Sequence, residues 1–257
     1  MTNLNYKIIG EGEPILFLHG FMGSSNDWIN IANSLNAKSI LVDLPGHGKS
    51  INLDDYEMEF ENVVNEIRKI ISQKINGKVN IVSYSMGSRF AIALACKFPE
   101  LVDKLVIESG TAGIQDPEER ETRKEIDKVL AQKIRSSELE DFLDDWYNLL
   151  LWGNIKTNPN YNQMISSRLK NNKEEIARSL ELMGTGNQKS YWDEMKNFNS
   201  EVLFITGEDD KKYSGIGTKM NDLNPKIKLK IIKDAAHNVH FEKEDIFIQL
   251  IKDFIGE

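Results

Sequence analysis

Short, largely apolar runs recur along this chain, separated by longer stretches whose apolar residues lie three or four positions apart. A short apolar run between turn residues is typical of a strand buried on both faces of a sheet. Such runs predict strands at 15–18, 39–42, 79–82, 104–108, 202–206 and 227–232. A more polar run at 5–9 predicts an edge strand.

The stretches between these runs have the spacing of amphipathic helices. They predict helices at 24–35, 60–75, 90–98, 214–223 and 243–255, the first of them capped by Ser24. Strands that alternate with helices indicate a mostly parallel central sheet with right-handed crossovers and helices on its flanks.

The alternation is interrupted once, over residues 113–189. This segment contains no strand-like run, and its apolar spacing predicts helices at 116–135, 138–150, 160–170 and 173–183. We therefore expect an all-helical lid at 113–189, inserted into an α/β core that is formed by residues 1–112 and 190–257.

The composition narrows the classes of function. A net charge of −8 with no basic cluster argues against nucleic-acid binding. The single cysteine, Cys96, excludes an intramolecular disulfide framework, and no metal-ligand pattern occurs. Residues 1–5 lack signal-peptide features, and no apolar run approaches the roughly 20 residues of a membrane span. We expect a cytoplasmic protein without membrane insertion, a monomer or weak homo-oligomer.

The most informative stretch is the turn between the strand at 79–82 and the helix that follows. Ser85 occupies this turn and is followed two positions later by Gly87. A serine at a sharp strand-to-helix turn is a nucleophile elbow, usually Gly-x-Ser-x-Gly. Ser83 replaces the first glycine, so the match is imperfect and the rest of the chain has to supply the partners of the serine.

Two later strand ends offer an acid and a base. Asp210 lies three positions after Gly207, directly beyond the strand at 202–206, with Glu208 and Asp209 as competing acids. His237 follows the last strand and is favoured as the base over its competitor, His240, because it comes first after that strand.

The early strand at 15–18 supplies the remaining element. It is followed by His19, Gly20 and Phe21, at the place where an oxyanion hole receives its second N–H. The donors would be the backbone N–H groups of Phe21 and Met86. Along the chain, the loop at 19–21 is followed by the Ser85 turn, then by Asp210 and then by His237, each at a predicted strand end. This order predicts an α/β-hydrolase fold with a Ser85–His237–Asp210 triad. Such a triad can form an acyl-enzyme or remove a proton beside a ketone, and the residues alone leave both open.

Several longer motifs make the sequence resemble one family nearly end to end. They are the runs at 84–89, 117–123, 145–147, 168–172 and 183–188. The family is the 2-succinyl-6-hydroxy-2,4-cyclohexadiene-1-carboxylate synthases of menaquinone biosynthesis. Two departures from its pattern concern geometry: Ser83 at the elbow, and residues 234–236 where a glycine-containing lead to the histidine is more usual.

The resemblance implies a lyase that eliminates pyruvate from 2-succinyl-5-enolpyruvyl-6-hydroxy-3-cyclohexene-1-carboxylate. By analogy, His237, oriented by Asp210, activates Ser85, which takes the ring proton beside the succinyl ketone. The amides of Phe21 and Met86 hold the enolate oxygen, and enolpyruvate leaves. No cofactor is implied, because the ketone already acidifies the C–H bond.

The implied substrate is a small tricarboxylate, which gives the seven arginines of the chain a physical role. Positions that bind substrate in the family are matched here by Arg89, Arg123, Arg168, Tyr84, Trp146, His19 and Gly20. Arg120, one turn before Arg123, could exchange roles with it. The alternatives are a carboxylesterase or carbon–carbon hydrolase using the same triad, and a non-catalytic binding protein, which would normally have lost a triad residue.

Overall fold

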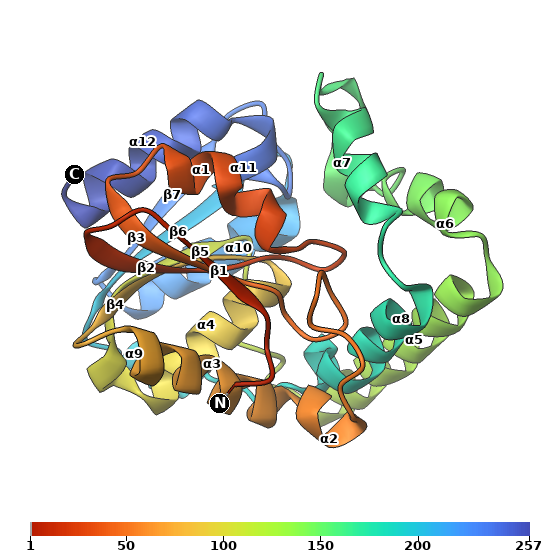
Figure 1. Ribbon diagram of the computed structural model, residues 1–257, viewed down its shortest axis with the longest axis horizontal. Coiled ribbons are helices and arrows are strands. Elements are labelled where there is room, and N and C mark those ends of the chain that lie inside the picture. The colour runs from red at the N-terminus through yellow and green to blue at the C-terminus, as the bar shows by residue number, and fades with distance from the viewer. Residues whose placement is uncertain (1) are drawn as a thin grey trace.

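A seven-stranded sheet forms the centre of the computed structural model, which describes residues 2–257 (Figure 1). Its strands are β1 (Tyr6–Ile9), β2 (Glu13–Leu18), β3 (Ala37–Val42), β4 (Val79–Tyr84), β5 (Val102–Glu108), β6 (Glu201–Gly207) and β7 (Ile227–Ile232). Their order is β1-β3-β2-β4-β5-β6-β7, and every neighbouring pair is parallel except β1 with β3. All seven predicted strands are present, and the predicted α/β-hydrolase fold class is confirmed.

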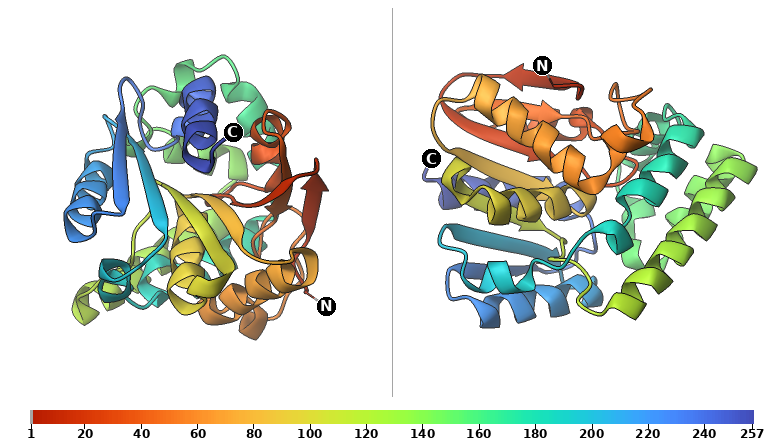
Figure 2. Two further views of the ribbon diagram at one scale, coloured as in Figure 1. Left: turned by 90° about the vertical axis from the view of Figure 1, so that its left-hand side faces the viewer. Right: turned by 90° about the horizontal axis from the view of Figure 1, so that it is seen from below.

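Helices cover both faces of the sheet, because each presents an apolar stripe to it (Figure 2). One face carries α3 (Phe60–Lys74), α4 (Met86–Lys97), α9 (Trp192–Lys196) and α10 (Lys211–Leu223). The other carries a 3₁₀ turn, η1 (Ser25–Trp28), which leads into α1 (Ile29–Asn33), and the closing helix α12 (Glu244–Ile255). The hydroxyl of Ser24 accepts the N–H of Asn26, so this serine caps the first helical segment as predicted.

Between β5 and α9 the described chain forms helices without a strand. They are α5 (Pro117–Ser136), α6 (Leu139–Trp146), α7 (Tyr161–Arg168) and α8 (Lys173–Met183), with the 3₁₀ turns η3 (Leu150–Trp152), η4 (Ile155–Thr157) and η5 (Thr185–Asn187). These helices share a separate apolar cluster that includes Phe142, Trp152 and Ile176. They project from one side of the sheet (Figure 1). The boundaries at 113 and 189 stay a prediction, and residue 1 of the core segment 1–112 lies outside the described residues.

A few local elements differ from the sequence pattern. The helix expected over 138–150 ends at Trp146, and a 3₁₀ turn follows. The helix expected from residue 90 begins at Met86, directly beyond the Ser85 turn. Two four-residue helices, α2 (Asp55–Met58) and α11 (Val239–Glu242), are too short to produce a periodic signal.

Candidate active site

The turn between β4 and α4 has the strained backbone of a nucleophile elbow. Ser85 has φ +49° and ψ −105°, a conformation that L-residues rarely adopt. A Cβ on Gly87 would lie 2.3 Å from the carbonyl oxygen of Leu18, so only glycine lets α4 approach β2 this closely. Ser83 is fully buried and its hydroxyl donates to the carbonyl of Val106 at 2.8 Å. The serine that replaces the usual glycine therefore has a hydrogen-bond partner on the neighbouring strand.

Ser85, His237 and Asp210 form a continuous chain of hydrogen bonds. The Nδ1–H of His237 donates to Oδ2 of Asp210 at 2.6 Å, and the hydroxyl of Ser85 donates to Nε2 at 2.9 Å. The Asp210 carboxylate also accepts the N–H of Tyr213. With its proton held on Nδ1, the imidazole directs the lone pair of Nε2 at the serine, which is the arrangement a general base requires.

The loops that hold the acid and the histidine touch each other. A Cβ on Gly207 would lie 2.1 Å from the carbonyl oxygen of Ala235, so the glycine allows the contact. Asp234 has φ +52° and adopts the left-handed conformation usually taken by glycine. This explains how the unusual lead at 234–236 still delivers the histidine. The competing acids Glu208 and Asp209 are exposed, whereas Asp210 is 2% exposed.

The loop after β2 lies opposite Ser85. A Cβ on Gly20 would lie 2.5 Å from the ring of Tyr84, so the loop passes close to the elbow. Nε2 of His19 accepts the N–H of Leu44 at 2.9 Å, which fixes the start of the loop. Phe21 and Met86, the proposed oxyanion donors, both line the cavity in front of Ser85. Met86 is the first residue of α4, so its N–H has no partner within the helix.

His47 is a supporting residue that the sequence pattern did not reveal. Its Nε2 accepts the N–H of Met22 at 3.2 Å, immediately after Phe21, and its Nδ1–H donates to the carbonyl of Pro45 at 2.8 Å. Burial lowers the pKa of His47 to about 3, so the ring remains neutral and keeps its acceptor. Because this contact joins residues far apart in the chain, periodicity carries no sign of it.

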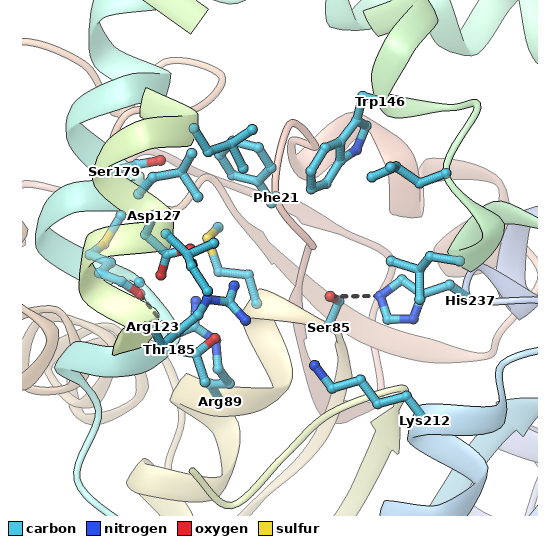
Figure 3. Close-up of a pocket in the computed structure, with 18 of the residues that line it drawn as sticks. Phe21, Ser85, Arg89, Arg123, Asp127, Trp146, Ser179, Thr185, Lys212 and His237 are labelled. Carbon is cyan, nitrogen blue, oxygen red and sulfur yellow. Dashed lines mark hydrogen bonds and ion pairs between the residues drawn. The ribbon is translucent and has the colours of Figure 1, made fainter. Parts of the chain in front are cut away.

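A cavity of about 610 Å³ opens above Ser85, between the sheet and the inserted helices (Figure 3). Eight predicted site residues line it: Phe21, Tyr84, Ser85, Met86, Arg89, Arg123, Trp146 and His237. Much of the remaining wall is apolar and comes from the insertion, including Leu130, Leu151 and Trp152. The structure thus brings together side chains from four strand ends and from the inserted helices.

Several charged side chains line this cavity. Arg89 is 7% exposed, and its guanidinium donates from Nη1 to the carbonyl of Met183 at 2.7 Å. Burial, together with the nearby Arg123, lowers the pKa of Arg89 to about 10. Arg123 donates from Nε to the buried carboxylate of Asp127 at 2.8 Å. Lys212 also lines the cavity, and the sequence pattern gave no indication of it.

Arg168 is not brought to this cavity in the structure. Its Nη1 and Nη2 donate to the two carboxylate oxygens of Asp27, each at 2.8 Å, in a pair that is largely buried. It borders a separate cavity of about 180 Å³. Of the two arginines that could exchange roles on α5, Arg123 is the one that lines the larger cavity. His19, Gly20 and Asp210 do not line the larger cavity; Gly20 lies against the ring of Tyr84, and Asp210 binds His237.

Within residues 2–257, no cluster of three or more His, Cys, Asp and Glu side chains is placed to hold a metal ion. In the same range no helix has both the length and the apolar character needed to cross a membrane.

The sheet topology and the Ser–His–Asp geometry are those of the α/β-hydrolases. A family model described as alpha/beta hydrolase fold matches residues 13–244. Two relatives narrow the assignment. A Bacillus subtilis protein, provisionally named 2-succinyl-6-hydroxy-2,4-cyclohexadiene-1-carboxylate synthase, is 33% identical over 98% of this chain and 95% of its own length. The solved structure of MenH from S. aureus superposes with a TM-score of 0.93 and 28% identity, covering 98% of this chain and 97% of that one.

The chain belongs to the α/β-hydrolase fold family and, within it, to the 2-succinyl-6-hydroxy-2,4-cyclohexadiene-1-carboxylate synthases. An Arabidopsis thaliana relative, Protein PHYLLO, chloroplastic, is 32% identical over 95% of this chain. The chain spans only 15% of the length of that protein.

Proposed function

We propose that this protein is a lyase that eliminates pyruvate from 2-succinyl-5-enolpyruvyl-6-hydroxy-3-cyclohexene-1-carboxylate, giving 2-succinyl-6-hydroxy-2,4-cyclohexadiene-1-carboxylate in menaquinone biosynthesis. The observation that carries the proposal is a serine, hydrogen-bonded to its histidine, on the floor of a cavity with mainly cationic charges. Family membership supports the same reaction.

In this mechanism the triad acts as a base. His237 accepts the hydroxyl proton of Ser85 while the serine oxygen takes the ring proton beside the succinyl ketone. The electron pair of that C–H bond moves onto the ketone oxygen to give an enolate. The enolate then re-forms the ketone, the ring double bond shifts, and the C–O bond to the enolpyruvyl group breaks. The departing enolpyruvate takes the proton held by His237 and tautomerises to pyruvate.

The developing enolate is stabilised by fixed dipoles. We assign the backbone N–H groups of Phe21 and Met86 as its donors, because both residues line the cavity in front of Ser85. Preorganised donors of this kind need no reorientation as charge develops, which lowers the barrier. Asp210 keeps His237 in the tautomer that accepts a proton at Nε2 and stabilises the imidazolium that forms.

The cavity walls suit the ring and its carboxylates. The ring of Trp146 lies edge-on to that of Phe21, with ring centroids 5.7 Å apart, and the two rings form an apolar wall. The ring of Tyr84 packs against that of His237, with ring centroids 5.4 Å apart. We assign Arg89 and Arg123 to carboxylates of the small tricarboxylate substrate, because a guanidinium can form two parallel hydrogen bonds with a carboxylate. The role of Arg168 stays a prediction from the resemblance.

The proposal includes a cytoplasmic enzyme that acts without a cofactor, as a monomer or weak homo-oligomer. The decisive assay measures pyruvate released by the purified protein from the cyclohexene substrate, in parallel with hydrolysis of p-nitrophenyl acetate. We expect pyruvate release to dominate. Efficient ester hydrolysis without pyruvate would instead assign the triad to a carboxylesterase, and absence of both activities would leave a binding protein.

A further inference from the structure

The cavity holds a cation with no assigned task. Lys212 is the second residue of α10, two positions after Asp210, and it lines the cavity. Figure 3 shows its ammonium turned toward Ser85, on the side opposite Trp146. The group lies over the ring of Tyr213, 5.4 Å from the ring centroid, and forms no hydrogen bond or ion pair with residues 2–257.

The charges that line the cavity do not balance. Its described lining contains one carboxylate, Asp127, which binds Arg123. Lys133 is paired outside with Asp145 at 2.8 Å. Within residues 2–257, neither Arg89 nor Lys212 forms an ion pair with a carboxylate, although Asp127 attracts both through space and Asp210 attracts Lys212.

The like charges in the cavity act on one another electrostatically. Desolvation and then the positive charge of Arg123 lower the pKa of both Lys212 and Arg89, and the carboxylate of Asp127 opposes the shift in both. Lys212 is exposed to solvent, whereas Arg89 is buried. Unfavourable proximity of like charges, in a protein of net charge −8, indicates a site that an anionic ligand completes.

The number of cations that could bind the substrate carboxylates gives a second argument. The substrate in the proposed function has three carboxylates, and the resemblance offers Arg89, Arg123 and Arg168 for them. Arg168 pairs with Asp27 through Nη1 and Nη2 and does not line the cavity. Lys212 is the further unpaired cation in the described cavity lining.

We propose that Lys212 binds one carboxylate of the substrate, together with Arg89 and Arg123 on the other side of Ser85. This assignment deepens the proposed function and rests on it. A single ammonium fixes a carboxylate mainly by charge, whereas the arginines can also fix its orientation.

Lys211 provides a matched control. It has the same charge and lies on the same helical turn, but its Nζ donates to the carbonyl of Glu208 at 2.8 Å and it does not line the cavity. A nonspecific effect of positive charge near α10 would affect both lysines equally. A binding role would affect Lys212 alone.

The test compares the wild type with Lys212→Gln, Lys212→Arg and Lys211→Gln in the pyruvate-release assay. We expect the KM of Lys212→Gln to rise about tenfold, as for the loss of one charge-assisted hydrogen bond. Lys212→Arg should recover most of this loss, and Lys211→Gln should match the wild type. An unchanged KM in Lys212→Gln, or an equal rise in Lys211→Gln, would overturn the assignment and leave the proposed function standing.

Calorimetric titration with propane-1,2,3-tricarboxylate separates the two proposals. If the wild type releases no pyruvate, the proposed function fails, and this titration decides the role of Lys212. Binding that is about tenfold weaker in Lys212→Gln than in Lys211→Gln would support a carboxylate site at Lys212. Equal binding by the two variants, or no binding to the wild type, would count against it.

Discussion

Two histidine–carboxylate pairs lie three residues apart in this protein and look alike at first. His237 donates from Nδ1 to Asp210 at 2.6 Å, and His240 donates from Nδ1 to Glu108 at 2.6 Å. All four side chains are buried. Judged by the carboxylate alone, either histidine could be the base of a triad.

The surroundings of the second ring nitrogen distinguish the pairs. Nε2 of His237 faces the hydroxyl of Ser85 at 2.9 Å, on the floor of the large cavity. The ring of His240 instead stacks on Trp28, 4.4 Å between centroids, and borders the smaller cavity. Its Nε2 makes no hydrogen bond with residues 2–257.

The second pair has a structural task near the first. Both oxygens of Glu108 are used, because the backbone N–H of His240 donates to it as well, at 2.9 Å. The backbone carbonyl of Glu108 accepts the N–H of Ser85. Glu108 therefore ties the histidine loop to the strand beside the elbow. A carboxylate orients the imidazole in both pairs, while the partner of the other nitrogen determines whether the imidazole can act as a base.

Removing the hydroxyl of Ser85 tests this distinction most severely. We expect Ser85→Ala to lower the rate of pyruvate release by about 10³-fold or more, since the remaining parts of such a site retain only a fraction of its rate enhancement. The melting temperature should change little, because the deletion leaves no unpaired carboxylate. Release is measured with a coupled assay of pyruvate.

Ser88→Ala is the matched control for this deletion. Ser88 is buried on α4, and its hydroxyl donates to the carbonyl of Glu108 at 3.2 Å, away from the cavity. Its loss should leave pyruvate release near the wild-type rate. If Ser85→Ala kept a tenth or more of the wild-type rate, the first pair would lose its proposed advantage over the second.

His240→Ala tests the structural task of the second pair. The change leaves the carboxylate of Glu108 buried with only a backbone partner, so the free energy of unfolding should fall by about 3 kcal/mol. Urea unfolding measures the loss. Well below the melting temperature, the folded variant should still release pyruvate. A variant as stable as the wild type but inactive would reverse the roles of the two histidines.

Much of this site was predictable because its chemistry lies at strand ends. Ser85, Asp210 and His237 each follow a buried apolar run, and such runs mark strands directly in the sequence. In a parallel sheet these ends meet at one edge, so the order of the runs places the three residues together. Choosing His237 over His240 by position after the strand agrees with the cavity geometry.

The parts that were not predictable depend on pairing between distant side chains. Arg168 lies 141 residues from Asp27, and His240 lies 132 residues from Glu108. Neither pairing leaves a periodic signal. Nothing in the sequence distinguishes Lys212 from other surface lysines. Its place in the cavity depends on the fold, which brings the start of α10 close to the elbow.

The smallest expected effect concerns the loop that carries His237. The carboxylate of Glu242 accepts the N–H of Ala236 at 3.0 Å and also that of Asn238, so it holds both neighbours of His237. Burial raises the pKa of Glu242 to about 7, aided by the nearby charge of Glu108 and opposed by Lys243 and the two N–H groups.

Since the pKa of Glu242 is higher in the folded than in the unfolded chain, the folded state retains the proton over a range where the unfolded state has lost it. The stability that this proton contributes is complete below the unfolded pKa of 4.5 and is lost as the pH rises through about 7. Between pH 5 and 8, the wild type should therefore lose about 1 kcal/mol of unfolding free energy relative to Glu242→Gln, allowing for solvent screening. Urea unfolding across this range measures the difference. If the unfolding free energies of the two proteins changed in parallel with pH, Glu242 would not titrate in this range. The loop that carries His237 would then be held independently of the charge of Glu242.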